Sequence, residues 1–174
     1  MSNTPIYLTN IHTPIGGMVA GACETGICLL EFNSTERIST ARKELSRRLV
    51  ADFITGSHPH LATLMEQLDA YFAGQRRTFD LPLVFPGSAF QVSVWQRLLQ
   101  IPYGQTISYE KLALDLGNIL SIRAVAHANG QNRLAILIPC HRVINKDGGL
   151  GGYGGGLPAK QWLLDLERGQ ARLM

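Results

Sequence analysis

A cysteine, a histidine and a carboxylate in the last third of the chain could carry out nucleophilic chemistry together. Cys140 and His141 are neighbours in the segment ILIPCHRVIN (residues 136–145), and Glu167 follows them. A thiol becomes a useful nucleophile when its pKa falls, which requires a nearby proton acceptor or positive charge, and a histidine oriented by a carboxylate can be that acceptor. Neighbours on a strand point to opposite faces, so contact between the two side chains requires a turn or a bridging water, and Pro139 favours such a break. The alternative is a structural cysteine that fills the core.

A glycine-rich segment after this pair favours a ligand pocket. Residues 148–156 contain seven glycines around Tyr153, and a helix carrying Lys160 and Trp162 comes next. Glycine backbone can approach a planar ligand closely because it carries no Cβ. Such a segment can also be a linker or a phosphate-binding loop, but the GxxxxGK[ST] pattern is absent. A pocket beside Cys140 explains these glycines better.

Apolar residues at helical spacing predict three helices before the cysteine. The helices span about residues 88–100, 106–116 and 121–129. Trp95 lies on the apolar face of the first helix. Thr106 or Ser108 is expected to cap the second helix, Gly117 makes the turn, and Ser121 caps the third. Two helices joined by a short glycine-containing turn have the layout of a helix-turn-helix.

The third helix carries Ala124, Ala126 and Ala128 beside one cation, Arg123. Small side chains permit close approach to a groove, and an arginine can reach far from the helix. On these features alone DNA binding is an open interpretation, because such helix pairs are also common packing units and alanine is simply a good helix former.

The first 85 residues are predicted to form a separate lobe. Apolar runs broken by turn residues predict antiparallel strands between residues 6 and 33. The period then becomes helical, which predicts one helix over residues 34–54 and another over 60–75, followed by a proline-punctuated connector. The sequence therefore predicts an α+β chain with an N-terminal lobe at residues 1–85 and a mostly helical domain at 86–174.

Composition places the chain among folded globular proteins, with 45% hydrophobic and 17% charged residues. A net charge of +3 is compatible with nucleic acid and with many proteins that never bind it. Neither a secretory signal nor about 18 consecutive apolar residues are present, so no membrane association is expected and a cytoplasmic protein is predicted, or a nuclear one in a eukaryote. Three cysteines without an export signal predict free thiols.

Cys23 and Cys28 lie in a predicted hairpin, in which they could face each other. They could supply two metal ligands, but tetrahedral zinc normally takes four and this spacing is uncommon. Two small buried hydrophobes are the better interpretation, and no metal is expected.

Several motifs in order and spacing resemble one family. ISYEKLA, IRAVAHANGQN, IPCHRV and GYGGGLPAKQWLLDLE closely resemble the O6-alkylguanine-DNA alkyltransferases, densely over about residues 85–170 and loosely before. The resemblance implies an N-terminal lobe with a small antiparallel sheet, and a C-terminal lobe that holds the helix-turn-helix and the reactive cysteine. It also implies a repair protein that flips O6-alkylguanine, and O4-alkylthymine, from duplex DNA and moves the alkyl group irreversibly to its own cysteine.

The resemblance assigns the catalytic roles. Cys140 is similar to the alkyl acceptor, His141 to the base that acts through a water, and Glu167 to its orienting carboxylate. Tyr109 resembles the tyrosine that assists proton transfer to guanine, and Asn132 the hinge asparagine between recognition helix and active site.

The resemblance also assigns DNA and substrate contacts. Arg123 is similar to the arginine that fills the space of the extruded base, with Ser121, Ala124 and His127 nearby on the DNA-binding helix. The expected substrate-binding residues are Trp95, Val143, Tyr153, Gly154 and Lys160. His127 stands where the family often has a small residue, and Gly154 where some relatives have serine, which affects helix seating and tolerance for larger alkyl groups.

The resemblance implies alkylated double-stranded DNA as the partner, a monomer, no cofactor, and no obligatory protein partner. Three other functions stay open from the sequence. An alkyltransferase-like binding protein would lack the reactive cysteine, which is present here. A cysteine hydrolase would need an oxyanion hole and would turn over. A helix-turn-helix regulator would leave the group of Cys140, His141 and Glu167 unexplained.

Overall fold

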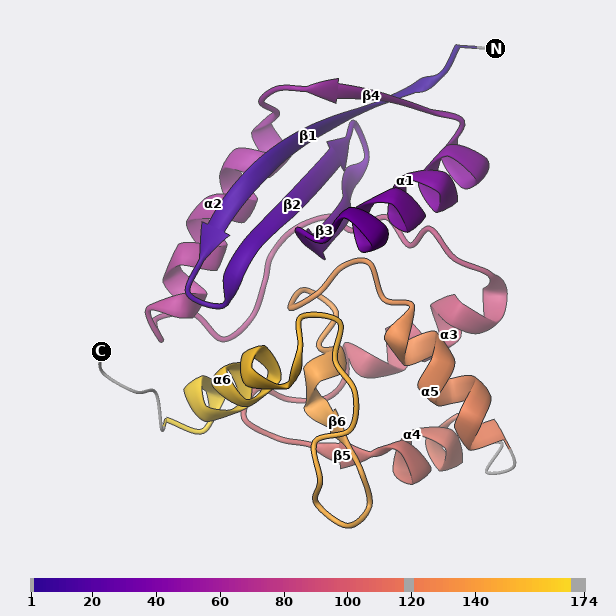
Figure 1. Cartoon of the computed structure of the whole chain (residues 1–174), viewed down its shortest axis with the longest axis vertical. Coiled ribbons are helices and arrows are strands. Elements are labelled where there is room, and N and C mark those ends of the chain that lie inside the picture. The colour runs from indigo at the N-terminus through magenta and orange to yellow at the C-terminus, as the bar shows by residue number, and fades with distance from the viewer. Residues whose placement is uncertain (1, 118–120, 170–174) are drawn as a thin grey trace. The chain divides into compact units, whose positions relative to one another are not determined.

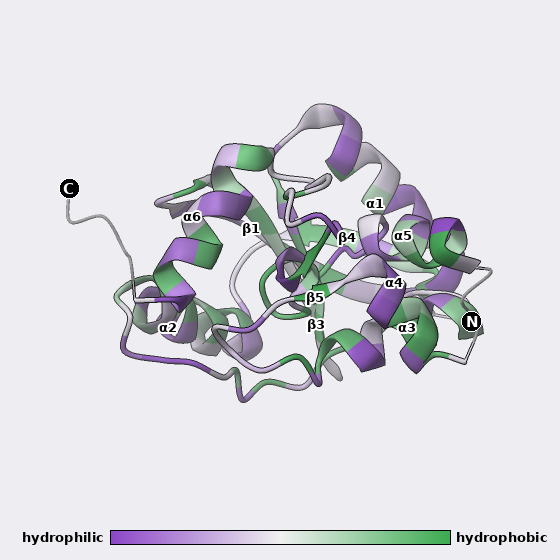
Figure 2. Cartoon of the chain, turned by 90° about the horizontal axis from the view of Figure 1, so that it is seen from below, coloured by the Kyte–Doolittle hydropathy of each residue, from purple (hydrophilic) through white to green (hydrophobic). Residues whose placement is uncertain are grey.

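The computed structural model describes residues 2–117 and 121–169. The chain divides into two compact units, Met1–Gly87 and Ser88–Met174 (Figure 1). A four-stranded sheet and two helices make up the described part of the first unit, and helices predominate in the second, so the predicted α+β class is confirmed. Helices carry both hydrophilic and hydrophobic residues, as amphipathic packing requires (Figure 2). Within the described ranges, none of the helices is long and apolar enough to cross a membrane.

The first unit is a four-stranded sheet with the order β3-β2-β1-β4. Its strands are β1 (Thr4–Thr13), β2 (Gly16–Cys23), β3 (Gly26–Phe32) and β4 (Ala51–Thr55). The first three pair antiparallel, as predicted, through turns at residues 14–15 and 24–25. From Met18 onward β2 and β3 are buried at consecutive positions, which requires cover on both faces of the sheet. Helices α1 (Thr35–Leu49) and α2 (Pro59–Phe72) provide it (Figure 1).

The prediction of one helix over residues 34–54 is wrong at its C-terminal end. Ser34 caps α1 at the predicted start, but the helix ends at Leu49, and Val50 follows with a left-handed φ of 50°. The next five residues form β4, which pairs parallel with β1. The sheet is therefore mixed and not purely antiparallel, because backbone pairing along β1 outweighs the apolar spacing that suggested more helix.

The proline-punctuated connector packs against the edge of β3. The amide of Ile27 donates to the carbonyl of Pro82 at 2.9 Å, and the amide of Val84 donates to the carbonyl of Ile27 at 2.9 Å. Gly26 is required there, since its φ is +154° and a Cβ would lie 2.4 Å from the Pro82 carbonyl oxygen. This edge is thus covered by the chain's own connector.

Cys23 and Cys28 belong to the core between the sheet and α1. They pack with Ile6, Leu29 and Leu45, and no disulfide joins them. Burial, followed by the nearby Cys23, raises the pKa of Cys28 to about 12. The part of the chain that the structure describes contains no cluster of three or more His, Cys, Asp or Glu residues that could hold a metal.

The second unit begins with α3 (Ala89–Leu98), which Ser88 and Gln91 start with a reciprocal capping box. Next come β5 (Ile107–Ser108), α4 (Tyr109–Asp115), α5 (Ile122–Gly130), β6 (Val143–Ile144) and α6 (Leu157–Glu167). β5 and β6 form a short parallel pair. Helices α3, α4 and α5 pack on one another. The three helices predicted before the cysteine are therefore present, and α4 and α5 are the predicted helix-turn-helix pair.

Candidate active site

Cys140 lies on a single turn of 3-10 helix, η2 (Cys140–Arg142), and not on a strand. Pro139 precedes the turn with ψ of 63°, so the chain leaves the extended conformation at the position where the sequence predicted a break. Cys140 is 8% exposed and His141 is fully buried. The turn therefore lies inside the unit, with Cys140 slightly accessible and His141 not.

The imidazole of His141 is oriented by the carboxylate of Glu167. Its Nε2 lies 2.6 Å from Glu167 Oε2, and both side chains are buried. A neutral histidine that donates from Nε2 keeps a lone pair on Nδ1. His141 Nδ1 is buried without a hydrogen-bond partner in the described structure. The geometry thus provides an oriented imidazole with one basic nitrogen available.

Arg142 completes this arrangement, although the sequence motifs assigned it no role. Its Nε and Nη2 donate to the two oxygens of Glu167 at 2.7 and 3.1 Å, and its Nη1 donates to the carbonyl of Ile101 at 2.7 Å. The amide of Gly104 also donates to Glu167, at 3.2 Å. The one available signal was an arginine inside an otherwise apolar segment, because a buried arginine requires an anionic partner.

These contacts fix the protonation states of the pair. Burial lowers the pKa of His141, and this outweighs the opposing effect of Glu167. Burial alone would raise the pKa of Glu167, but hydrogen bonds from His141 and Arg142, together with the charge of Arg142, hold it well below its usual range. At neutral pH the carboxylate is therefore ionised and the imidazole is neutral, which is the form that accepts a proton.

Lys160 ties the glycine-rich loop to the active-site turn. Its ammonium donates to the carbonyls of Val143 at 2.7 Å, Gly152 at 3.2 Å and Leu150. Burial lowers the pKa of Lys160 to about 8, and a negative charge on Cys140 opposes that shift. The Lys160 side chain is buried, and its ammonium lies close enough to Cys140 to interact with a thiolate there.

Tyr109 faces the same turn from the first residue of α4. Burial raises the pKa of Tyr109, and a charge on Cys140 raises it further. Gly151, with φ of +71°, would place a Cβ 3.2 Å from the tyrosine hydroxyl. A side chain at position 151 would crowd the phenol, and the positive φ also favours glycine there. The raised pKa keeps the phenol protonated at neutral pH.

Asn132 stabilises the loop that leads into the turn. Its Oδ1 accepts from the amide of Leu134 at 2.9 Å and its Nδ2 donates to the carbonyl of Ile138 at 2.8 Å. Ile136, between these two positions, has φ of 72°. The amide side chain thus closes a strained loop between α5 and Cys140.

The other predicted substrate residues are divided between loop and interior. Tyr153 is half-buried and Gly154 is exposed in the glycine-rich loop, and Val143 contributes the carbonyl that Lys160 binds. Trp95 is 2% exposed, and its Nε1 donates to the carbonyl of Ala128 at 2.9 Å. In this structure Trp95 holds α3 against α5.

The predicted DNA-binding residues lie on α5. Arg123, Ala124 and His127 are exposed, while Val125 and Ala128 are buried against the neighbouring helices. Ser121 occupies the N-cap position but makes no capping hydrogen bond, so that part of the prediction is wrong; its backbone ψ of 23° differs from the extended N-cap conformation. In the second helix Ser108 and not Thr106 is the cap.

Comparison with known proteins identifies both units. The model of the 6-O-methylguanine DNA methyltransferase ribonuclease-like domain matches residues 6–85, and that of the DNA-binding domain matches residues 89–169. The chain is 40% identical over 168 residues to a methylated-DNA–protein-cysteine methyltransferase from Methanosarcina barkeri, covering 96% of this chain and 100% of that one. It is 39% identical over 163 residues to the constitutive methylated-DNA–protein-cysteine methyltransferase of Bacillus subtilis, covering 93% and 95%.

Solved structures give the same result. Mycobacterium tuberculosis OGT in complex with DNA superposes with a TM-score of 0.80 and 37% identity, covering 95% of this chain and 94% of that one. O6-methylguanine-DNA methyltransferase from Pyrococcus kodakaraensis superposes with a TM-score of 0.65 and 25% identity, covering 93% and 98%. The resemblance in the sequence motifs is confirmed, and the chain belongs to the 6-O-methylguanine DNA methyltransferase family.

Proposed function

We propose that this chain repairs alkylated DNA by transferring the alkyl group from O6 of guanine, and from O4 of thymine, to Cys140. One observation carries the assignment of the residue: Cys140 precedes a buried histidine that binds Glu167 through Nε2 and keeps Nδ1 available. Family membership and relatives named for this activity support the reaction. A relative solved in complex with DNA supports DNA as the partner.

The proposed reaction begins with ionisation of the thiol. His141 takes the proton of Cys140 through a water, and Glu167 with Arg142 behind it stabilises the imidazolium that forms. The buried ammonium of Lys160 stabilises the thiolate by charge. The sulfur then attacks the alkyl carbon as the carbon–O6 bond breaks, and its electrons pass into the guanine ring.

Tyr109 is suited to complete the proton balance. Its raised pKa keeps the phenol protonated, so it can donate to the guanine as charge develops there, and it recovers a proton from the imidazolium through solvent. The products are unmodified guanine and an S-alkyl cysteine. A thioether is chemically stable and nothing in the site regenerates the thiol, so each molecule acts once and needs no cofactor.

The target base must leave the helix stack before the thiolate can reach it. Extrusion costs a few kcal/mol, and less for a lesion that pairs poorly. The exposed face of α5 is proposed to lie in the DNA groove, with Ser121, Ala124 and His127 against the backbone and Arg123 in the space of the extruded base. Asn132 would keep the turn from α5 to Cys140 rigid, and Tyr153, Gly154 and Val143 would line the base pocket.

A labelled-DNA experiment tests the function directly. After incubation with duplex DNA carrying labelled O6-methylguanine, mass spectrometry should find one alkyl group per protein molecule, on the peptide that contains Cys140. Label on Cys23 or Cys28 would contradict the assignment. Continued turnover would indicate a hydrolase, and binding without transfer would indicate an alkyltransferase-like protein.

Arg123 provides a separate test of base flipping. We predict that Arg123→Ala loses most repair of duplex DNA but reacts with free O6-alkylguanine base at close to the wild-type rate, because the free base needs no extrusion. Arg123→Lys should also slow duplex repair, since lysine lacks the planar guanidinium that can stack in the vacated space. Equal losses on both substrates would mean that Arg123 supports the fold or pocket instead.

The remaining aspects of the proposal concern the setting of the reaction. We propose a monomer that acts in the cytoplasm, or the nucleus of a eukaryote, without an obligatory protein partner. Binding should be largely independent of base sequence and should weaken as salt rises, since repair must act wherever the lesion falls. A strong consensus sequence on undamaged DNA would favour a regulator.

A further inference from the structure

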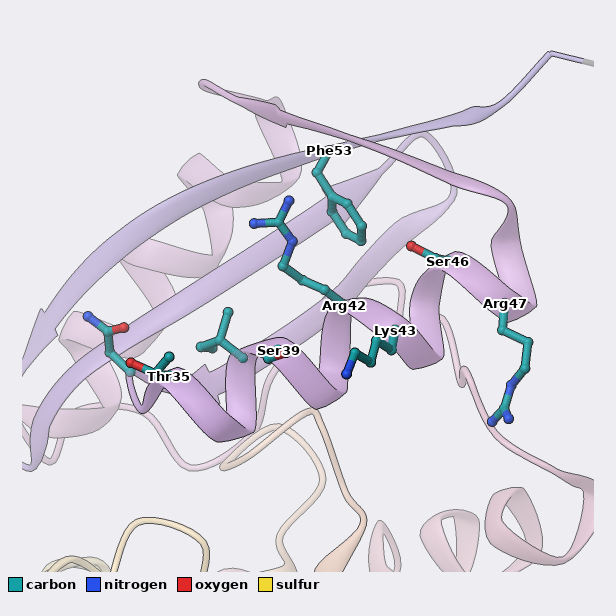
Figure 3. A pocket seen from close by; sticks show the side chains of 9 residues that line it. Thr35, Ser39, Arg42, Lys43, Ser46, Arg47 and Phe53 are labelled. Carbon is teal, nitrogen blue, oxygen red and sulfur yellow. The ribbon is translucent and has the colours of Figure 1, made fainter.

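A cationic groove runs beside α1 in the N-terminal unit, whose residues take no part in the proposed reaction. Its cavity has a volume of about 890 Å³. Six polar side chains of α1 line it: Thr35, Ser39, Arg42, Lys43, Ser46 and Arg47 (Figure 3). Ile38 of the same helix and Phe53 of β4 add apolar surface. We call this feature the α1 groove.

The six polar residues are placed by helix geometry. Residues 35, 39, 43 and 47 follow one another at intervals of four, and residues 42 and 46 lie between them, so all six share one side of the helix. Four residues of α-helix rise about 6 Å, so hydrogen-bond donors repeat at that interval along about 18 Å. Such a row matches an extended ligand with repeated acceptors.

The charge of the groove is concentrated and unneutralised. Residues 1–87 contain seven Lys and Arg against eight Asp and Glu, so the lobe as a whole is slightly acidic. No carboxylate is among the residues that line the groove. Lys43 and Arg47 make no salt bridge with any residue that the structure describes, whereas Arg37, which does not line the groove, binds Glu31 at 2.9 Å. Arg42, Lys43 and Arg47 are therefore exposed together on a lobe that is acidic as a whole. This concentration of positive charge favours an anionic ligand.

The groove also offers a flat surface. The guanidinium of Arg42 lies 4.6 Å from the centre of the Phe53 ring, and Figure 3 shows the two side chains meeting between α1 and β4. A guanidinium held in this way has a second face on which a planar group can stack. A smaller cavity of about 510 Å³ shares Asn33, Ile38 and Arg42 with the groove and extends it along β1.

These features favour one class of ligand. Repeated phosphates match the row of donors and cations, and bases match the flat apolar surface, a combination typical of surfaces that bind single-stranded nucleic acid. The cavity is of the size that holds a small molecule, so a duplex is too wide to enter it. An acidic peptide would use the charges but not the stacking surface.

We propose that the α1 groove binds a short single-stranded segment of nucleic acid, with phosphates along Lys43 and Arg47 and a base on Arg42. This second site would be independent of alkyl transfer, because none of its residues belongs to the C-terminal unit.

The test uses the full chain and an oligothymidylate of eight nucleotides, which offers no guanine to the active site. Amide NMR should show perturbations at residues 33–53 on titration. The double substitution Lys43→Gln and Arg47→Gln should weaken the binding reported by these amides at least about fivefold and reduce the salt slope by about 1.4, at 0.7 for each phosphate contact. Arg48→Gln, which removes a charge from α1 outside the groove, is the matched control and should change neither.

Two further measurements decide the ligand class. Arg42→Lys keeps the charge but loses the stacking surface, and should weaken oligothymidylate binding at least about fivefold. Poly-glutamate at equal charge should compete poorly, and thymidine monophosphate should bind far more weakly than the oligomer. Four results would each overturn the proposal. The perturbations could be confined to the C-terminal unit, or the double variant could bind as well as the Arg48→Gln control. Poly-glutamate could compete fully, or thymidine monophosphate could bind as tightly as the oligomer.

Discussion

Cys28 and Cys140 are both buried, at 0% and 8% exposure, but the groups around them differ completely. Cys28 is surrounded by aliphatic side chains and a second thiol, and burial raises its pKa to about 12. Cys140 adjoins a fully buried imidazole and interacts by charge with Lys160 and Tyr109.

The difference shows that burial does not by itself make a thiol reactive or inert. Desolvation disfavours the thiolate in both places, because an anion loses its hydration there. At Cys140 a nearby cation and an oriented imidazole favour the thiolate, whereas at Cys28 the second thiol adds to the effect of burial and backbone hydrogen bonds offset only part of it. Reactivity in this chain is therefore a property of the neighbours of each cysteine, and exchanging or removing those neighbours tests it.

The largest expected effect comes from Cys140→Ser, which should abolish transfer while leaving affinity for alkylated DNA intact. A serine hydroxyl remains protonated in a site that activates a thiol, so it is a far poorer nucleophile. Label transfer and a binding titration on the same protein measure the two properties. Cys23→Ala is the matched control, and it should transfer one alkyl group per molecule; loss of transfer there would break the contrast between the two regions.

Glu167→Gln should reduce the transfer rate by about 10²- to 10⁴-fold, the usual contribution of a general base. The amide cannot hold His141 in the same tautomer or balance the charge of Arg142. Removing one partner of a buried ion pair costs about 3–5 kcal/mol, so unfolding should also become easier. Transfer must therefore be measured under conditions where circular dichroism shows a folded protein. An undiminished rate would mean that the carboxylate of Glu167 is not needed to orient His141.

Arg142 illustrates which part of the site is predictable from sequence. Cys140, His141 and Glu167 are residue types with recognisable chemistry, so local motifs are enough to indicate them. The role of Arg142 depends on Ile101 and Glu167, which lie 41 and 25 residues away in the chain and are brought together only by folding. Local patterns carry no information about such distant contacts.

The fold shows the same division. Ser34 and Ser88 cap helices at the positions that capping chemistry predicts. Residues 51–55 continue an apolar helical spacing, but β1 provides a strand edge for parallel pairing, and they form β4. The starts of α1 and α3 depend on neighbouring residues and could be predicted. The parallel pairing of β4 joins residues such as Thr4 and Ala51, which are far apart in the sequence, so apolar spacing alone does not reveal it.

Lys160→Met should slow transfer by about 10- to 100-fold, less than the loss of the base. The substitution removes the cation near Cys140 and the three hydrogen bonds to the carbonyls of Val143, Leu150 and Gly152. Each tenfold loss corresponds to about 1.4 kcal/mol of stabilisation of the reacting state. Lys160→Arg keeps the charge and separates the two effects. If both variants react at the wild-type rate, Cys140 is activated without this cation.

The smallest expected effect concerns the inert thiol and appears in stability and not in transfer. An unfolded chain loses the Cys28 proton above pH 9, while the folded protein keeps it until about pH 12. Between these values the unfolded state binds fewer protons, so the free energy of unfolding falls as pH rises, by at most about 1.4 kcal/mol per pH unit from this group. Cys28→Val removes the titrating group and keeps a small apolar side chain in the core. Denaturant unfolding at pH 8, 9 and 10, with reductant present, should show a shallower decline for the variant than for the wild type. Parallel declines would mean that Cys28 ionises in the folded protein as readily as in the unfolded chain, and the contrast with Cys140 would then lose its physical basis.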